Sequence, residues 1–208
     1  MITFLYGSGL LFSLILGCFL INWSRYLNGG ATAKESALEL PGDGIVAKID
    51  FNATRCITIN APPDRIWRWI IQMGSKRAGW YSVDWIDHHG TERSKRILPL
   101  FQKIKIGQFI PFTPDQKNGM WVQAFQENSY IIWTDKVGNA SWLWYLIPDA
   151  DGNTRLLTRL RTRYNWKNFW IIYCLIYDVG DIMMMSLCMK GIKNRAEDET
   201  PKLKTNGG

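Results

Sequence analysis

The sequence predicts an α+β fold behind an N-terminal transmembrane helix. The fold consists of a curved antiparallel sheet of about six or seven strands, two short helices and a long C-terminal helix. Three observations predict it. Residues 2–23 form an apolar run without a charged side chain. A strand pattern, a proline break and an amphipathic helix pattern follow one another in residues 54–74. Short β-branched or aromatic runs, separated by turn residues, then repeat between residues 108 and 164.

The apolar run 2–23 is predicted to be an uncleaved membrane anchor. As a helix it would be roughly 33 Å long, which matches a hydrocarbon core of about 30 Å. A signal peptide is the alternative, but it needs positive charge ahead of the run, and none is present. A lipoprotein signal ending at Cys18 is disfavoured by the apolar residues 19–21 that follow it. Basic residues after the run favour a single-pass protein of the cell membrane whose domain is cytoplasmic.

Composition narrows the classes of partner. The 208 residues carry a net charge of +7 and include 11 Trp, 9 Phe and 8 Tyr. Aromatic side chains at this density bury large areas and line ligand cavities. The basic residues suit an anionic membrane surface, and since no nucleic-acid-binding motif accompanies them, nucleic acid is not an expected partner. The four cysteines lack metal-ligand and C-x-x-C spacing, so no metal or disulfide is expected. No cofactor is expected either, because the sequence contains no dinucleotide-binding or phosphate loop.

Behind the anchor, residues 24–50 are predicted to be a polar linker, residues 51–197 one domain, and residues 198–208 a disordered tail. The linker contains the flexible pair Gly29-Gly30 and the turn pair Pro41-Gly42. The predicted domain, residues 51–197, is large enough to bury a hydrophobic core.

The domain opens with a strand and a helix. Residues 54–59 are rich in β-branched side chains, and the prolines that follow end the strand. Pro63 suits the first turn of a helix and Asp64 suits the positive end of its dipole, whereas Gly74 is a typical C-terminal stop. A second short helix is predicted over residues 82–89, with Ser82 as N-cap.

An antiparallel meander and a long helix complete the predicted domain. In the last strand, arginines 155, 159, 161 and 163 alternate with apolar or threonine side chains. This alternation predicts either a solvated face, which is the favoured reading, or a face that binds an anion. The long helix is predicted over residues 177–196, because the apolar run 169–176 is interrupted too early to span a membrane. The predicted strands are 108–112, 120–126, 130–135, 141–148 and 154–164.

This order of elements is that of the helix-grip fold, and the chain resembles the SRPBCC superfamily of START-like and polyketide cyclase/dehydrase-like proteins. It is most similar to a membrane-anchored bacterial branch. The resemblance implies a curved sheet that grips the long helix around an apolar cavity for a lipid-like or aromatic molecule. The chain departs from that branch at Ser75-Lys76 and in the apolar run 169–176. The residues that carry the resemblance include Gly30-Ala31-Thr32, Leu40-Pro41-Gly42-Asp43, Thr54-Arg55, Gly79-Trp80-Tyr81-Ser82, Asp84-Trp85, Ile97-Leu98-Pro99, Ser141-Trp142 and Thr154-Arg155-Leu156.

The candidate site is a set of aromatic side chains expected to face this cavity, with one arginine near its mouth. No catalytic constellation is visible, because His88 and His89 are adjacent and point in different directions on a helix. Tyr81 and Asp84 could transfer protons in an enzyme, but they could equally tie a loop to the sheet. The predicted ligand-binding residues are Arg77, Trp80, Tyr81, Trp85, Trp121, Trp133 and Trp144.

Three hypotheses for function follow. The first is a membrane-anchored protein that binds a hydrophobic small molecule or lipid in an internal cavity. The second is a cyclase/dehydrase-like enzyme that uses the same cavity. The third is a membrane-tethered interaction module that uses its basic surface. The sequence leaves open whether the chain is an enzyme, which ligand it binds and how many copies assemble.

Overall fold

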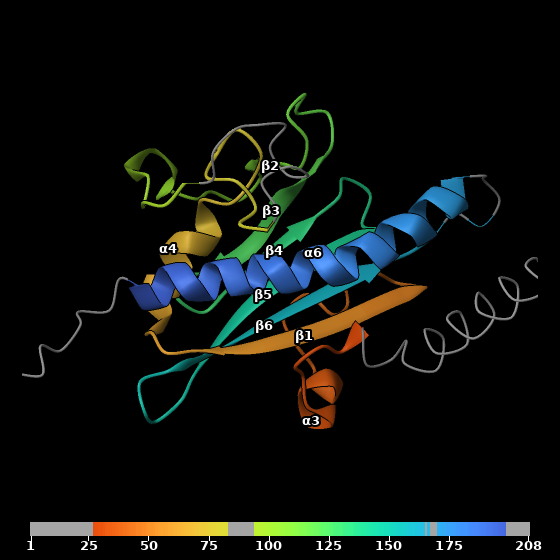
Figure 1. Ribbon diagram of the computed structural model, residues 1–208. Helices are drawn as coiled ribbons and strands as arrows, with labels where there is room; N and C mark the ends of the chain where they lie inside the picture. The colour runs from red at the N-terminus through yellow and green to blue at the C-terminus, as the bar shows by residue number, and fades with distance from the viewer. Residues whose placement is uncertain (1–26, 83–93, 165, 167–169, 199–208) are drawn as a thin grey trace, which may run out of the picture.

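The structure of the chain is a computed structural model that describes residues 27–82, 94–164, 166 and 170–198, without the side chains of residues 170–183. These residues contain one antiparallel sheet of six strands in the order β1-β6-β5-β4-β3-β2 (Figure 1). Every strand expected from the sequence is present. The strands are β1 (Phe51–Ile59), β2 (Phe109–Pro111), β3 (Gly119–Gln126), β4 (Tyr130–Thr134), β5 (Ala140–Pro148) and β6 (Thr154–Thr162).

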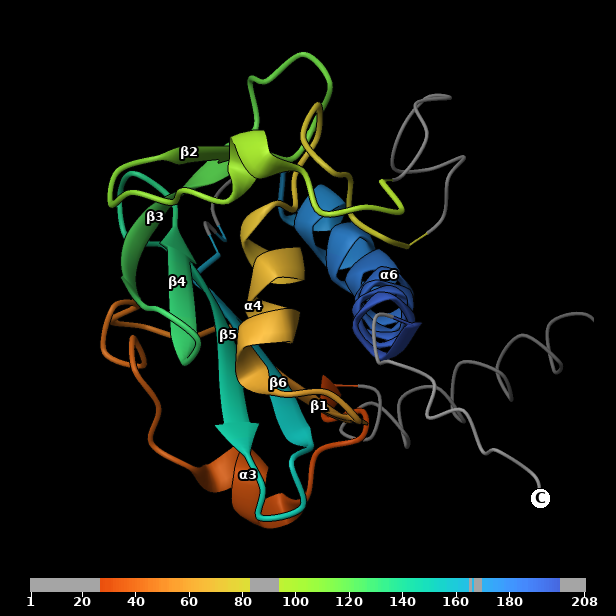
Figure 2. The same ribbon diagram turned by 90° about the vertical axis from the view of Figure 1, so that its left-hand side faces the viewer.

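The described residues also form three α-helices. They are α3 (Ala33–Ala37), α4 (Pro63–Ile71) and α6 (Trp170–Asp198). Helices α4 and α6 cover one face of the sheet, called here the inner face, and the N-terminal segment covers the opposite, outer face (Figure 2). A six-stranded antiparallel sheet with a long C-terminal helix across its inner face is the arrangement of the helix-grip fold.

Helix α4 forms where the sequence predicts it. Pro63 occupies the first turn and Asp64 is the acidic residue of that turn, whereas Arg68 lies in the last turn, so the charges match the helix dipole. One side of the helix is buried in the main core through five large apolar residues: Ile66, Trp67, Trp69, Ile70 and Ile71.

Helix α6 is one continuous element that begins at Trp170, earlier than the predicted start at residue 177. The apolar run 169–176 hides the start, because a segment that is apolar on all sides shows no helical periodicity. The buried residues of its described half are Met185, Cys188, Met189, Ile192 and Ala196. Among the described residues, no helix combines the length and apolar character needed to cross a bilayer. The predicted anchor 2–23, the body of the second short helix (83–89) and residues 199–208 of the tail lie outside the described residues.

The outer face is covered by residues 27–47, called here the strap. Helix α3 of the strap starts at a capping box, in which Thr32 and Glu35 exchange hydrogen bonds between side chain and backbone. Behind it, Leu40 packs into a second, smaller core on the outer face, together with Cys56, Ile132, Leu143 and Leu157. Part of the segment predicted to be a polar linker is therefore packed on the sheet.

Three arginines of β6 hold the strap in place, and the expectation of a solvated face was wrong for Arg155, Arg159 and Arg161. Arg155 contacts Glu35 at 2.6 Å, and Arg159 contacts Asp43 at 2.7 Å. Arg161 contacts the same Asp43 at 3.0 Å. Arg159 also donates to the Leu38 carbonyl at 2.8 Å, and only 2% of its side chain is exposed. These arginines bind acidic and carbonyl groups of the same chain, which the sequence pattern of β6 alone could not show.

Candidate functional site

Five aromatic side chains meet on the inner face and are called here the aromatic cluster: Trp80, Phe112, Trp133, Trp142 and Trp144. Strand geometry assembles most of it. Trp133 of β4 pairs directly with Trp142 of β5, and Trp144 lies two residues further along β5, so all three side chains point to the same face. Trp80 reaches the cluster from the loop that follows α4.

The rings of the cluster are in close contact. Trp80 stacks on Trp142 with ring centroids 5.7 Å apart and an interplanar angle of 13°. Trp133 meets Trp142 edge to face at 5.2 Å, and Trp144 lies 5.3 Å from Trp142. Such offset-stacked and edge-to-face pairs contribute about 0.5–1.5 kcal/mol each beyond the burial of area. The cluster is therefore a closely packed aromatic surface in the interior.

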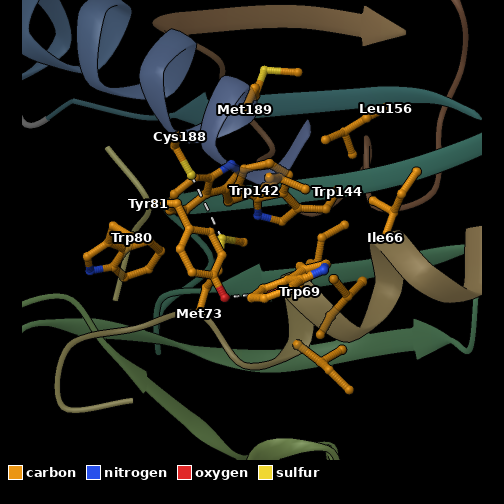
Figure 3. Close-up of a cluster of buried hydrophobic side chains, with 14 of the residues drawn as sticks. Ile66, Trp69, Met73, Trp80, Tyr81, Trp142, Trp144, Leu156, Cys188 and Met189 are labelled. Carbon is orange, nitrogen blue, oxygen red and sulfur yellow. Dashed lines mark hydrogen bonds between the residues drawn. The ribbon is translucent and has the colours of Figure 1, made fainter. Parts of the chain in front are cut away.

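The hydrogen-bond donors of these indoles are satisfied unequally. Trp142 Nε1 donates to Thr158 Oγ1 at 2.8 Å, and that hydroxyl donates to the Leu143 carbonyl at 3.0 Å. The Nε1 atoms of Trp69, Trp133 and Trp144 are buried and have no acceptor among the described residues. Trp69 belongs to α4 and lies in the same core as Trp144 (Figure 3). Three indole N–H groups in one interior thus lack a partner within the described chain.

Tyr81 is buried beside the cluster and its hydroxyl is fully engaged. It donates to the Trp69 carbonyl at 3.1 Å (Figure 3). It also accepts a hydrogen bond from Gln72 Nε2 at 2.8 Å. Burial raises the pKa of Tyr81 well above its usual value, although the hydrogen bond from Gln72 opposes the shift. A phenol held between these two groups positions α4 against the loop and is poorly placed to exchange protons near neutral pH.

Arg77 holds the loop after α4 against the end of that helix. Arg77 donates to the carbonyls of Ile71 and Met73 at 2.7 and 3.0 Å, which places a cation at the negative end of the helix. Its guanidinium lies 4.5 Å from the centroid of the Phe101 ring. Burial lowers the pKa of Arg77 to about 10, so the residue remains a cation at neutral pH.

The C-terminal half of α6 closes over Tyr81. The guanidinium of Arg195 lies 4.4 Å from the ring centroid of Tyr81 and 6.0 Å from that of Trp69. Arg195 also donates to the Ser94 carbonyl at 3.1 Å. Gly191 lies against the backbone of Tyr81, so closely that a Cβ at this position would overlap the Tyr81 carbonyl. The glycine allows the helix to approach this loop.

The predicted site residues fall into three groups. Trp80, Tyr81, Trp133 and Trp144 share the main core, and Arg77 borders it in the loop that carries Trp80 and Tyr81. Trp121 pairs with Thr134 on the outer face, where its ring meets Phe109 at 4.7 Å and Lys136 at 4.9 Å. Trp85 lies outside the described residues, as do Asp84, His88 and His89. In the part of the chain that is described, no group of three or more potential metal ligands is found.

Sequence reasoning missed five residues of this site: Trp69, Gln72, Phe112, Trp142 and Arg195. For Trp142 a signal was present, because residues i and i+2 of a strand share a face and Trp144 was already a candidate. Trp69 carried a similar signal, since it lies on the apolar side of the predicted helix. Gln72 and Arg195 act through contacts with distant segments, such as the Leu98 amide and Tyr81. No local sequence pattern predicts such contacts.

No protein-family model and no curated protein matches the chain. Among solved structures, the chain is similar to CalC, a self-sacrificing resistance protein from Micromonospora echinospora, with 11% identity, a TM-score of 0.48 and coverage of 74% of this chain and 98% of that one. A conserved protein of unknown function from Enterococcus faecalis shows 19% identity, a TM-score of 0.44 and coverage of 73% and 72%. A Polyketide_cyc-like protein from Corynebacterium glutamicum shows 15% identity, a TM-score of 0.37 and coverage of 70% and 86%.

Proposed function

We propose that this chain is a binding protein for a hydrophobic small molecule or lipid that carries hydrogen-bond acceptors. The ligand lies in the interior between the sheet, α4 and α6, against the aromatic cluster. The chain is held at the cell membrane by its N-terminal segment, with its domain in the cytoplasm, so that ligand can be taken from the adjacent bilayer.

The observation that carries the proposal is that the indole donors of Trp69, Trp133 and Trp144 are buried and find no acceptor among the described residues. A buried donor without an acceptor costs about 1–3 kcal/mol, and native proteins keep few of them. Trp133 and Trp144 are neighbours with ring centroids 6.2 Å apart. Carbonyl or ether oxygens of a bound molecule would satisfy these donors, while its apolar part would contact the rings. Apolar walls with a few convergent polar groups are typical of small-molecule sites.

A binding role agrees better with the site than catalysis does. The Tyr81 hydroxyl is occupied by Gln72 and by the Trp69 carbonyl, and no other described group of the cluster is a candidate acid or base. The donors that remain are indole N–H groups, which orient a ligand but do not exchange protons near neutral pH.

A matched pair of probes tests the proposal. Fluorenone and fluorene have nearly the same shape, but only fluorenone carries a carbonyl acceptor. Their affinities for the full chain in amphipol would be measured by quenching of tryptophan fluorescence. We expect the wild type to prefer fluorenone by about three- to ten-fold, as one hydrogen bond predicts. Trp133→Phe and Trp144→Phe, which keep a ring but remove the N–H, should each reduce this preference.

Trp166→Phe is the matched control, because Trp166 is exposed and its Nε1 already donates to Asp50 at 3.0 Å. This variant should retain the wild-type preference. Equal affinity for the two probes in the wild type, or no saturable binding of either, would contradict the proposal. Loss of the preference in Trp166→Phe as well would show that the signal does not come from the interior.

A further inference from the structure

Two of the most exposed large apolar side chains lie in one basic segment. Leu100 is 82% exposed and Ile106 is 69% exposed. Between residues 94 and 114 the chain contains four basic residues and no acidic one. These basic residues, Lys95, Arg96, Lys103 and Lys105, are all exposed. The segment precedes β2, the strand at one edge of the sheet, and lies beside it, drawn in light green (Figure 2).

The exposure of Leu100 and Ile106 is imposed by the fold of the segment, because its other apolar residues point inward. Ile97, Leu98 and Ile104 pack against the main core. The outward side chains thus alternate along the chain with inward ones, and both belong to a segment that is anchored to the domain.

Two hydrogen bonds accepted by Gln72 and the cation–π contact of Arg77 fix this segment to the domain. The Leu98 amide donates to Gln72 Oε1 at 2.9 Å, and Gln102 Nε2 donates to the same oxygen at 3.2 Å. Phe101, next to Leu100, lies beneath the Arg77 guanidinium. Near the other end, the Gly107 amide donates to the Val122 carbonyl at 2.7 Å. Leu100 and Ile106 are therefore exposed on a segment whose backbone is fixed to the domain at both ends.

We propose that residues 95–107 form a docking surface for an anionic lipid bilayer. Leu100 and Ile106 enter the boundary between headgroups and acyl chains, and the four basic side chains bind the phosphates around them. Each cation near such a surface strengthens binding by about five-fold. The docking needs no ligand in the interior and is independent of the function proposed above.

A bilayer fits these residues better than a protein partner does. The cores of protein interfaces are enriched in aromatic side chains and depleted in lysine. Here two separate aliphatic side chains lie among lysines, and the described part of this segment contains no exposed aromatic residue. Lysine stems can extend along apolar surface while their ammonium groups reach the phosphates, which is the behaviour a lipid interface favours.

Amide hydrogen exchange of the full chain tests this surface, because its readout is local and does not depend on how the rest of the chain is held. The chain would be placed in nanodiscs of phosphatidylcholine, in nanodiscs that also contain phosphatidylglycerol, and in detergent. We expect peptides covering residues 95–107 to exchange at least about five-fold more slowly in the anionic discs than in the phosphatidylcholine discs or in detergent. The exposed turn around Val137 should exchange equally in all three.

Two double variants and one control complete the test. Lys103→Glu with Lys105→Glu should remove the effect of phosphatidylglycerol, and Leu100→Ser with Ile106→Ser should reduce protection in the anionic discs. Val137→Ser, at a side chain that is 74% exposed elsewhere, should change nothing. Equal exchange of residues 95–107 in all three media would overturn the proposal. Protection in detergent that grows with protein concentration would overturn it in favour of a second copy of the chain.

Discussion

At the scale of single residues, the pair Glu35 and Arg155 shows how the strap is fastened. Arg155 donates two hydrogen bonds to the Glu35 carboxylate, at 2.6 and 2.9 Å. These bonds lower the pKa of Glu35 from 4.5 to about 2. Since the pKa of the folded state lies below that of the unfolded state, the ionised carboxylate stabilises the fold at all pH values above about 4.5.

This linkage predicts a pH dependence that Glu35→Gln should abolish. As the pH falls from about 5 to about 2, the wild type should lose roughly 1 kcal/mol more of its free energy of unfolding than the variant, after allowance for solvent screening of a partly exposed pair. Urea unfolding at a series of pH values measures the difference. Parallel curves for the two proteins across this range would show that Glu35 does not contribute in this way.

Residue contacts were the least predictable part of the molecule. The alternation of β6 identified a row of arginines, but their acidic partners lie more than a hundred positions earlier, in a segment read as a linker. Trp121 was predicted to face the cavity together with the interior aromatics, yet its pairing with Thr134 places it on the outer face. Face assignment needs the register of the sheet, which a sequence leaves undetermined where a bulge such as that between Val122 and Ala124 intervenes.

At the scale of elements, prediction was most successful where periodicity and stop signals agree. The strands and α4 combine a clear pattern with Pro, Gly or Asp at their ends, and their observed bounds lie close to the expected ones. The start of α6 was missed, since its apolar first turns carry no contrast between faces. Helix α3 was missed because five residues held by one capping box are too short to show a period.

The contact between α6 and the loop at Tyr81 depends on the absence of a side chain at Gly191. Gly191→Ala would place a Cβ against the Tyr81 carbonyl and Cβ, and Tyr81 already adopts a φ of 59°. We expect this variant to lower the free energy of unfolding by about 1–3 kcal/mol, as overpacking of a close contact does. Chemical denaturation measures the effect.

Gly44→Ala is the control, because a Cβ there would meet no atom within 4 Å. It should leave stability unchanged or slightly higher, since alanine restricts the unfolded chain. A stability for Gly191→Ala equal to that of Gly44→Ala would mean that α6 does not press on this loop.

At the scale of the whole molecule, the sheet is covered on both faces, and the strap and α6 lie on opposite faces. Helices α4 and α6 cover the aromatic inner face, and the strap covers the charged outer face (Figure 2). Arg159 joins the strap to the sheet through Asp43, the Leu38 carbonyl and the Thr54 hydroxyl.

Arg159→Leu should therefore release the strap. Removing one partner of a buried, hydrogen-bonded ion pair costs about 3–5 kcal/mol, and here the lower end is expected because Arg161 still contacts Asp43. Lys34, an exposed residue of α3, should then be cleaved by trypsin much faster than in the wild type, since cleavage requires local opening of the segment.

Arg163→Leu provides the comparison, because Arg163 belongs to the same alternating row but is exposed. Its stability should stay within about 0.5 kcal/mol of the wild type, and cleavage at Lys34 should keep its wild-type rate. Rapid cleavage at Lys34 in the wild type itself would show that the strap is loosely held.

A packed strap also limits how far the domain can swing. A free chain of about 24 residues would span roughly 27 Å between its ends. Here the Gly29 carbonyl accepts a hydrogen bond from the Cys56 amide in the edge strand β1, and Leu27 packs against the main core. The packed strap therefore cannot extend over this distance. A group that holds the chain ahead of residue 27 will consequently fix the orientation of the domain as well as its distance from that group.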